Sequence, residues 1–419
     1  MSSVSFVLSG FAALLAATQI SGGPAQAERA VAVLANSPAV KAALAGARTG
    51  EPATVDLQVR LAQIPAPPFK ESVRAQELRR LFVEAGLKNV RIDRVGNVVG
   101  DRPGSLPHPH VVIAAHLDTV FPEGTDVRVR RDGPVLHGPG VGDDSRGLAM
   151  LVAAIRAMNA ANIRTDGPLT FVADVGEEGL GDLRGMKELF DVTLKGQADR
   201  FVAVDGAGMG IASTFVASRR YRVTFSGPGG HSFGDFGLAS PVDALARAVT
   251  KISAIPVPAE PKTTFNVGRI GGGTAVNAIP ADAWMELDLR SADRRALAAL
   301  DASVKSAISA AVSETGAGRR GAVAVKSELL GERPGGALPA DSPLVLIARA
   351  ATHAVGGSPI EAISSSDANY PMSLGIPSIE LATGGRGAGT HSINESFDTT
   401  NSALGTERLV LVAIALAQR

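Results

Sequence analysis

Short apolar runs alternate with stretches of helical periodicity through the first half of the chain. Apolar runs lie at Val111–Ala115, Leu169–Ala173 and Phe201–Val204. Between the first two runs, residues 145–159 repeat apolar side chains at helical spacing, namely Leu148, Leu151, Val152 and Ile155. The runs are typical of buried strands. Their alternation with helices predicts an α/β domain with a mainly parallel sheet over about Ala30–Ala212.

The pattern changes after residue 220 and returns near residue 331. Strands are predicted at Tyr221–Phe225, Thr264–Ile270, Ala283–Leu289 and Ala322–Leu329, and helices at Pro241–Ile255 and Arg294–Ser313. This β-α-β-β-α-β order is that of a ferredoxin-like sandwich. We therefore expect residues 216–330 to form an inserted α+β domain, and residues 28–215 and 331–419 to form one discontinuous α/β domain.

The first 27 residues have the pattern of a secretory signal peptide. An apolar run over residues 4–18 leads into Gly22-Gly23-Pro24, and Ala25-Gln26-Ala27 matches a small-x-small cleavage pattern. No Lys or Arg precedes the run, so an unstructured start is the alternative. The run is too short to span a membrane, and we expect no other segment to span one. The pattern predicts a secreted or periplasmic protein.

Composition narrows the partners and the kind of site. The 419 residues include 41 Lys and Arg against 41 Asp and Glu, so the formal net charge is zero. Nucleic-acid binding normally requires a basic face, so we expect no nucleic-acid partner. The chain has no cysteine, which excludes disulfides and thiolate-bound metal. Any metal site must therefore use His, Asp and Glu.

Histidines and acids gather just past the ends of predicted strands. They are His116 and Asp118 after the first run, Glu177 and Glu178 after the second, Asp205 after the third and His391 after a later run at Ile379–Ala382. Asp143 follows the glycine-rich stretch 138–142, just before a predicted helix. Ligands bind at the carboxyl ends of strands in open α/β sheets, so we expect these side chains to meet at one edge.

The gathered side chains suit a pair of metal ions. Imidazoles and carboxylates are ligands of a catalytic zinc that keeps one position open for water. Two such ions lie ~3.5–4 Å apart in aminopeptidase-type sites, where one carboxylate can bridge them. Asp143 is the expected bridge, because its glycine-rich loop can approach closely. Asp118 could orient the nearby His116. Of Glu177 and Glu178, one can bind metal while the other serves as a general base.

Five short motifs give the chain a resemblance to a known family. They are His116-Leu117-Asp118, Gly142-Asp143-Asp144, Gly176-Glu177-Glu178-Gly179, Val204-Asp205-Gly206 and Thr390-His391-Ser392. In this order they resemble the co-catalytic di-zinc metallopeptidase family of tripeptidase T, glutamate carboxypeptidase and aminoacylase. The resemblance covers nearly the whole chain after the leader. It implies a zinc-peptidase α/β fold with an inserted lid domain that mediates homodimerisation.

The resemblance also implies individual roles. One zinc ion would be held by His116, Asp143 and Asp205, and the other by Asp143, Glu178 and His391. Glu177 would be the base and Asp118 the orienting residue. In the insert, His231 of Gly229-Gly230-His231-Ser232 looks like the lid histidine, which stabilises the oxyanion in the partner's site. Asn277 and Arg290 look like substrate-positioning residues, and Ser366-Asp367-Ala368-Asn369 resembles a stretch of tripeptidase-like members.

Simpler interpretations exist for several of these residues. Glu177 and Glu178 could form a solvated acidic turn, Asp205 could start a turn with Gly206, and His231 could be a turn histidine. Arg290 could pair with Asp288 or Asp293 on the surface. No role is expected for Glu395 and Asp398, and a structural one is expected for His108, His110, His137 and His353. Asp144 is expected to cap the following helix.

Together these patterns predict hydrolysis of an amide bond in a di- or tripeptide. Two zinc ions are expected per chain, with cobalt or manganese possible. Through the resemblance, an aspartate at position 205 favours peptidases over deacylases. The alternatives are an N-acyl or N-carbamoyl amino-acid amidohydrolase and a glutamate-type carboxypeptidase. A non-catalytic zinc-binding relative is a further alternative, but it would not need the base Glu177.

Overall fold

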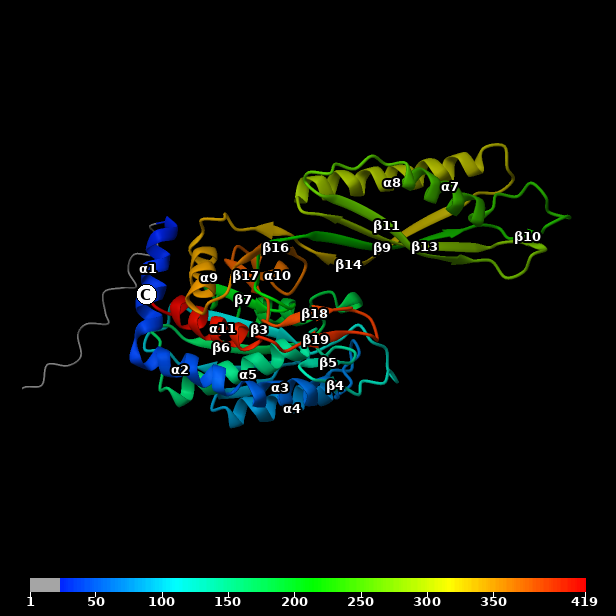
Figure 1. Cartoon of the computed structure of the whole chain (residues 1–419). Helices are drawn as coiled ribbons and strands as arrows, with labels where there is room; N and C mark the ends of the chain where they lie inside the picture. The colour runs from blue at the N-terminus through cyan, green and yellow to red at the C-terminus, as the bar shows by residue number, and fades with distance from the viewer. Residues whose placement is uncertain (1–22) are drawn as a thin grey trace, which may run out of the picture. The chain divides into compact units, whose positions relative to one another are not determined.

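The computed structural model describes residues 23–419, which form two compact units. Unit 1 comprises residues 23–213 and 338–419, and unit 2 comprises residues 214–337 (Figure 1). The apolar run at residues 4–18 of the predicted leader lies outside the described residues. Unit 2 ends at Ala337 and its last long strand reaches Arg333, so the border that we predicted after residue 330 lies within that strand.

Unit 1 opens with four helices rather than with a strand. They are α1 (Gly23–Asn36), α2 (Pro38–Thr49), α3 (Glu51–Ala62) and α4 (Ser72–Glu84). A proline near the first position of α2 and of α3 suits a helix start, where the missing N–H has no partner to lose. Helix α1 runs through the predicted cleavage point, with Ala27 only 1% exposed.

The large sheet, which lies in unit 1 apart from β15 and the end of β8, is mixed rather than mainly parallel. Its strands are β1 (Lys88–Ile92), β2 (Val98–Arg102), β3 (Val111–His116), β6 (Leu169–Asp174), β7 (Arg200–Val204), β8 (Gly210–Phe215), β15 (Gly336–Ala337), β16 (Ile360–Ser364) and β17 (Ser378–Leu381). Their order is β1-β2-β6-β3-β7-β17-β8-β15, with β16 beside β8. Strands β6, β3, β7 and β17 are mutually parallel, and the β1–β2, β2–β6, β17–β8 and β8–β15 pairs are antiparallel.

Helices cover the central strands and fix their ends. Helices α5 (Ser145–Ala160) and α11 (Ala403–Leu416) contact β3, and α9 (Pro343–Ala354) contacts β17. Every residue of α11 from Gly405 onward is buried, as expected for a helix that is apolar on nearly all sides. Each fully buried Leu or Val contributes about 1.5–3 kcal/mol. The remaining short helices are η1 (Gly179–Gly181), α6 (Arg184–Glu188), η2 (Leu189–Thr193) and α10 (Asn369–Ser373).

A second, small sheet in unit 1 brings two distant loops together. It consists of β4 (Arg130–Asp132), β5 (Val135–His137), β18 (Arg386–Ala388) and β19 (Ser396–Asp398), in the order β18-β19-β5-β4. Three-residue strands leave too short a pattern to read in the sequence, and this sheet was not predicted. It places the loop between β18 and β19 beside the loop after β5, where the Gly138 N–H donates to the Glu395 carbonyl at 3.0 Å.

Unit 2 has the predicted element order β-α-β-β-α-β. Its elements are β9 (Ala217–Ser226), α7 (Pro241–Ser253), β11 (Thr263–Gly272), β13 (Asp282–Ser291), α8 (Arg294–Gly316) and β14 (Ala324–Arg333). The strand order is β11-β13-β9-β14, and all three pairs are antiparallel. Both helices lie on one face of this sheet (Figure 1). The short strands β10 (Gly230–His231) and β12 (Ala278–Ile279) pair separately.

Helix α8 is long and apolar enough to cross a membrane by length and composition. Our expectation that no segment after the leader would meet that criterion was therefore wrong. Its larger apolar side chains, however, are buried in the core of unit 2: Leu297, Leu300, Val304 and Ile308. The Asp293 carboxylate caps the helix by accepting from two backbone N–H groups at 2.8 Å. These contacts are those of a core helix on a sheet.

Candidate metal centre

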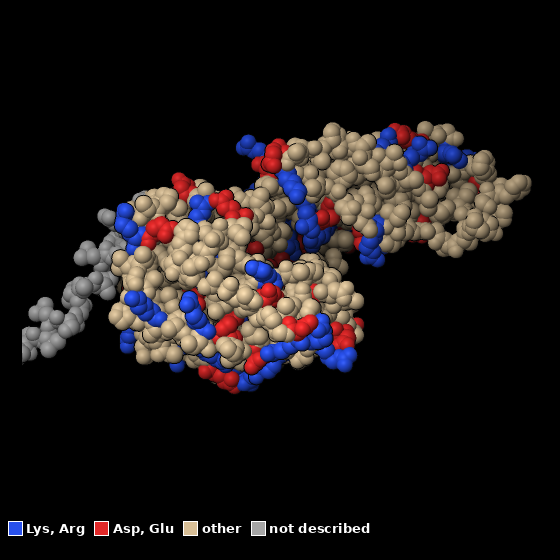
Figure 2. All heavy atoms as spheres, in the orientation of Figure 1, with Lys and Arg blue, Asp and Glu red and all other residues tan. Residues whose placement is uncertain are grey.

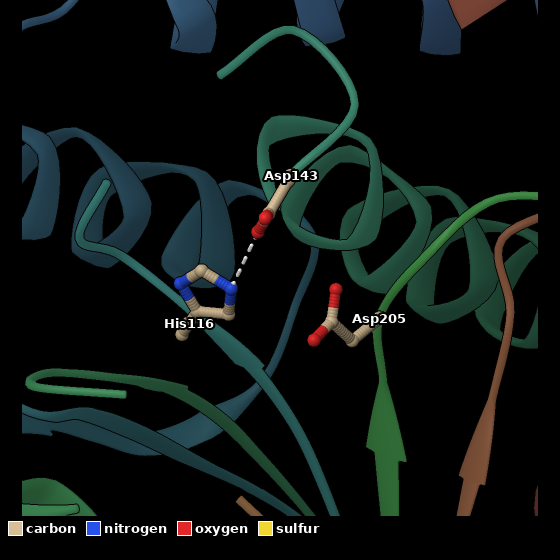
Figure 3. Close-up of side chains that lie close together, drawn as sticks. All are labelled: His116, Asp143 and Asp205. Atoms are coloured by element: carbon tan, nitrogen blue, oxygen red, sulfur yellow. Dashed lines mark ion pairs between the residues drawn. The ribbon is translucent and has the colours of Figure 1, made fainter. Parts of the chain in front are cut away.

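Three side chains converge at the carboxyl ends of neighbouring strands of unit 1. His116 ends β3, Asp205 directly follows β7, and Asp143 lies in the loop before α5. Figure 3 shows the three side chains pointing toward one another. His116 Nε2 lies 2.9 Å from Asp143 Oδ1. One ligand atom from each residue lies within 4.8 Å of the others, so a single metal ion could contact all three.

A second group of the same kind shares Asp143. His391 Nε2 lies 3.0 Å from Asp143 Oδ2 and 2.9 Å from Glu178 Oε1. Asp143 thus faces one histidine with each carboxylate oxygen, which is the position of a bridging ligand. We name His116, Asp143 and Asp205 the inner half of the cluster, and Asp143, Glu178 and His391 the outer half.

The residues present fit a pair of divalent metal ions. His116 Nε2 and Asp143 Oδ1 are both buried, and neither makes a hydrogen bond within residues 23–419, although they lie 2.9 Å apart. A buried polar atom without a partner is costly, and a metal ion between these atoms would satisfy both. Imidazole nitrogen and carboxylate oxygen are the usual protein ligands of zinc where no cysteine is present.

Burial and charge shift the pKa values of the cluster in the absence of metal. Burial, followed by the charge of Asp143, raises the pKa of Asp205 well above 3.8. Burial lowers the pKa of His116, but the contact with Asp143 and the negative charges of Asp143, Asp144 and Asp205 together outweigh burial and hold that pKa well above 6.5. Bonds to Asp143 and Glu178 raise the pKa of His391 to about 10. A metal ion must therefore displace protons from both histidines.

Asp118 acts on the cluster differently from the prediction. Its carboxylate is fully buried and accepts from the backbone N–H groups of Gly176 at 2.9 Å, Glu177 at 3.2 Å and Glu178 at 2.9 Å. His116 Nδ1 instead bonds the Asp118 carbonyl oxygen at 2.9 Å, while the carboxylate stands 3.8 Å away. The main chain of Asp118 orients the imidazole, and its side chain holds the turn that carries the two glutamates.

The glutamate pair faces the cluster rather than solvent. Glu177 is 5% exposed and Glu178 is 6% exposed, so the alternative of a solvated acidic turn is wrong. His116, Glu177 and Glu178 also have ligand atoms within 4.8 Å of one another. Glu178 Oε1 contacts His391, which gives Glu178 the place in the outer half, and Glu177 precedes it in the same turn.

The three candidate residues of the insert all lie in unit 2, where two of them meet. His231 on β10 and Asn277 before β12 are neighbours, and the Ser232 N–H donates to the Asn277 carbonyl at 3.0 Å. His231 Nδ1 accepts from the backbone N–H groups of Phe233 and Gly234, each at 3.2 Å. A nitrogen that accepts carries no proton, so the proton of the neutral ring is on Nε2. In Figure 2, the end of unit 2 that carries β10 is largely uncharged.

Arg290 lies elsewhere in unit 2, on β13 opposite Ser218 and Thr264. Its Nε donates to Asp288 at 2.6 Å, which is one of the surface pairs that the sequence allowed. The other, Asp293, caps α8 instead. The structure therefore groups His231 with Asn277 but not with Arg290.

Several acids near the cluster were missed or left without a role. Asp174 ends β6 opposite His116, Asp367 precedes α10, and both are buried. Asp174 directly follows a predicted strand, and this position could have identified it as a candidate site residue. Glu395 was left without a role, yet it is 2% exposed and its carboxylate accepts three backbone hydrogen bonds. Asp144 caps α5 as predicted, accepting from the Gly147 N–H at 3.0 Å.

Comparisons with known proteins agree on the fold. The family model described as "Peptidase family M20/M25/M40" matches residues 112–415. The uncharacterised protein YqjE of Bacillus subtilis is 26% identical over 373 residues, 85% of this chain and 94% of that protein. The solved aminopeptidase PepT of Bacillus cereus is similar with a TM-score of 0.72 and 24% identity, covering 88% of this chain and 99% of that one. A dinuclear metal-binding peptidase of the M20 family from Bacillus subtilis gives a TM-score of 0.67 at 15% identity, covering 88% and 99%.

Proposed function

The chain belongs to peptidase family M20/M25/M40, and from this premise we propose that it hydrolyses one amide bond in di- or tripeptides with two divalent metal ions. The observation that carries the proposal is the pair of ligand groups that share Asp143. A carboxylate that faces a histidine with each oxygen, with a further acid on either side, is the arrangement that a two-metal hydrolase needs.

The inner half would hold one ion and the outer half the other. Two Zn²⁺ ions, or Co²⁺ or Mn²⁺ in their place, would polarise the scissile carbonyl and lower the pKa of a water molecule between them. The chain's own contribution is to hold Asp143 between the two histidines. The main-chain oxygen of Asp118 fixes the ring of His116 and thereby its free nitrogen.

Glu177 is the proposed general base. Its backbone is held by the buried Asp118 carboxylate, and its neighbour Glu178 occupies the outer half. A carboxylate at this place would take the proton of the attacking water and return it to the leaving amine.

His231 is the proposed oxyanion donor. The two N–H groups that bond Nδ1 leave Nε2 as the proton-bearing atom, as the role requires. We propose that unit 2 is a lid that also dimerises, so that His231 serves the site of the partner subunit. Asn277 would position the substrate beside it. Asp288 holds Arg290 through Nε, and the two terminal nitrogens would receive a substrate carboxylate by parallel hydrogen bonds.

Two buried acids favour substrates with a free amino group. Apart from the contact between their carboxyl groups, Asp174 Oδ1, Asp174 Oδ2 and Asp367 Oδ1 have no hydrogen-bond partner in the described chain. Burial raises the pKa of both acids, to about 7 for Asp174. The ammonium of a peptide would stabilise their charged forms. An N-acyl or N-carbamoyl substrate brings no positive charge to this place. The acids therefore support a peptidase over an amidohydrolase.

A hydrolysis screen of the metal-loaded protein tests the proposal. Dipeptides, tripeptides, N-acetyl amino acids, N-carbamoyl amino acids and glutamate-terminated peptides would be compared by kcat/KM. We expect the free peptides to be cleaved best, and Asp367→Asn to raise KM for them more than for acylated substrates. Preference for an acylated substrate would replace the peptidase with an amidohydrolase. Two bound ions with no turnover of any substrate would indicate a zinc-binding protein.

We also propose that the chain is exported. The support for export is the leader pattern over residues 1–27. Separately, the zero net charge, with both signs interspersed, fits a protein without a nucleic-acid partner. On the face of unit 1 visible in Figure 2, basic and acidic side chains alternate without a single-sign field. Sequencing of the protein from its own host should give a mature start at Glu28, and recovery of the intact start from the cytoplasm would contradict export.

A further inference from the structure

Glu395 lies beneath the loop that carries the bridging aspartate. It is four residues after His391, in the loop between β18 and β19, and it is 2% exposed. Its Oε2 accepts from the Gly140 N–H at 2.9 Å. Its Oε1 accepts from the Gly142 N–H at 2.7 Å and from the Asp143 N–H at 3.0 Å. One buried carboxylate thus binds three N–H groups of the loop that ends in Asp143.

Two of the three glycines of this loop, Gly140 and Gly142, allow so close an approach. A Cβ built on Gly142 would lie 3.1 Å from Glu395 Oε1, closer than an ordinary contact. Gly140 has a φ of +69°, a left-handed conformation that favours glycine, and its Cβ would lie 2.9 Å from Thr119. The glycine-rich stretch therefore serves to bring the backbone onto the Glu395 carboxylate.

Regular structure does not hold this loop. Residues 138–144 lie between β5 and α5 and belong to no strand or helix. Besides Glu395, the contacts within the loop include the Gln58 side chain, which donates to the Val141 carbonyl at 2.7 Å, and a Val141 N–H bond to Gly138 at 3.3 Å. The three hydrogen bonds that the buried Glu395 side chain accepts from this loop outnumber these contacts. Glu395 is thus the main anchor of the Asp143 backbone.

The same residue also links the two ligand-bearing loops. His391 and Glu395 share the loop between β18 and β19, and the Glu395 carbonyl accepts from Gly138 at 3.0 Å. Fixing Asp143 against Glu395 therefore fixes it relative to His391. Glu395 is itself unsuited to bind metal, because its oxygens already accept three N–H groups.

We propose that Glu395 is a positioning residue that sets the bridging geometry of Asp143 and His391 for both metal ions. The inference rests on the proposed function, in which Asp143 bridges two ions. It assigns to the glycine loop and to Glu395 one joint purpose: to present both oxygens of Asp143 at fixed places before any metal arrives.

Metal affinity measured apart from turnover tests this role. Glu395→Gln keeps the size of the side chain, but its amide nitrogen cannot accept a hydrogen bond from an N–H group. We expect Zn²⁺ or Mn²⁺ to bind ~10- to 100-fold more weakly by calorimetry with chelator competition, the usual loss when a partner of a ligand is removed. The matched control is Asp398→Asn on β19, whose carboxylate accepts from the exposed Thr400 N–H at 2.9 Å and touches no metal-ligand candidate in the described contacts. The control should bind metal like the wild type.

A second variant approaches the same contact from the loop. Gly142→Ala leaves Glu395 intact but forces a methyl group against its carboxylate, and should weaken metal binding in the same sense. Gly46→Ala in α2 is its control, because a Cβ there meets nothing within 4 Å. A merely structural role would lower Tm equally with and without metal. A positioning role also shrinks the rise in Tm that metal produces.

The outcomes separate the two proposals. If the wild type binds no metal, the proposed function fails. If the wild type binds two ions and both Glu395→Gln and Gly142→Ala bind them with unchanged affinity, only the role of Glu395 fails. Weaker binding in both variants but not in the controls supports it.

Discussion

His116 and His391 each face one oxygen of Asp143, yet they are held in different ways. His116 is the last residue of the central strand β3, and its side chain is 1% exposed. A main-chain oxygen fixes its ring. The His391 side chain is 55% exposed and lies in a loop, where its backbone adopts a φ of 66°. Positive φ in a residue other than glycine is uncommon and is typical of functional sites.

The sheet therefore provides the inner half of the site, and a loop provides the outer half. A buried strand end opens only with the core of the domain, whereas exposed loops open at low cost. We therefore expect the inner ion to be bound more tightly than the outer ion. The predictions below test this contrast, beginning with the largest effect.

Metal removal should have the largest effect. Chelation should abolish turnover, and added Zn²⁺ or Mn²⁺ should restore it, because both halves take part in the reaction. During stepwise chelation one ion per chain should leave first. His391→Ala should retain about one ion, whereas His116→Ala should lose the tighter one. Elemental analysis of active enzyme that shows no transition metal would end the hypothesis. Release of both ions at the same chelator concentration would contradict the expected difference in affinity between the inner and the outer ion.

The adjacent glutamates should separate chemistry from binding. Glu177→Gln cannot accept a proton, so kcat should fall by ~10²-fold or more while two ions remain bound. Glu178→Gln should instead lose the outer ion. Glu328→Gln, an exposed acid of β14, is the control and should change neither. If the two mutants behave the other way round, the assignment of the pair is wrong.

A subunit-mixing experiment tests whether His231 reaches the site from a partner. His231→Ala should lose ~10²–10³ in kcat, as expected for an oxyanion donor. Glu177→Ala should also be inactive. Mixed dimers of the two variants would contain one intact site, in which an unmutated core receives an unmutated His231. Random exchange makes half the dimers mixed, so about a quarter of wild-type activity should return. Demonstrated exchange without activity would place His231 in its own chain or outside the reaction.

The smallest expected effect is a pH dependence of the metal-free protein. The raised pKa of His391, about 10, means that the folded chain binds this proton more tightly than the unfolded chain. The resulting stability is fully present below the ordinary pKa of 6.5 and is lost as pH rises from there to about 10. Since the side chain is half-exposed, we expect a loss on the order of 1–3 °C in Tm. His391→Ala should lose less stability over this pH range, because of the two histidines only His116 still has a raised pKa. Equal slopes in both proteins would contradict the contribution of His391.

The parts of the site that the sequence predicted are those that follow buried strands. His116 and Asp205 lie where they were predicted, because an apolar run marks each strand and the next polar residue marks its end. Glu178 lies in the turn that follows β6. The structure also brings Asp143 and His391 to them, as the five motifs implied. The element order of unit 2 was also predicted, and its central strand β13 alternates buried and more exposed positions.

The failures share a physical cause, which is that main-chain contacts leave little trace in composition. Any residue at position 118 could offer its main-chain carbonyl to His116. The prediction therefore assigned the orienting role to the Asp118 carboxylate instead. In the sequence, Glu395 has the character of an ordinary polar loop residue. Its hydrogen bonds to the N–H groups of a distant loop appear only in the structure. The antiparallel outer strands β1 and β2 are short and mix apolar with charged residues, so neither their presence nor their direction could be inferred.

The spacing of the site follows from the repeat of the backbone. His116 and Asp205 come from β3 and β7, which are direct neighbours, and the glutamates follow β6 on the other side of β3. Neighbouring strands lie about 4.8 Å apart, which is close to the span of two metal–ligand bonds of about 2.1 Å each. The main-chain hydrogen bonds between these strands therefore set the distances between the metal ligands. Every sequence with this fold makes the same bonds. Core side chains can drift under mutation while the distances between the ligands stay the same.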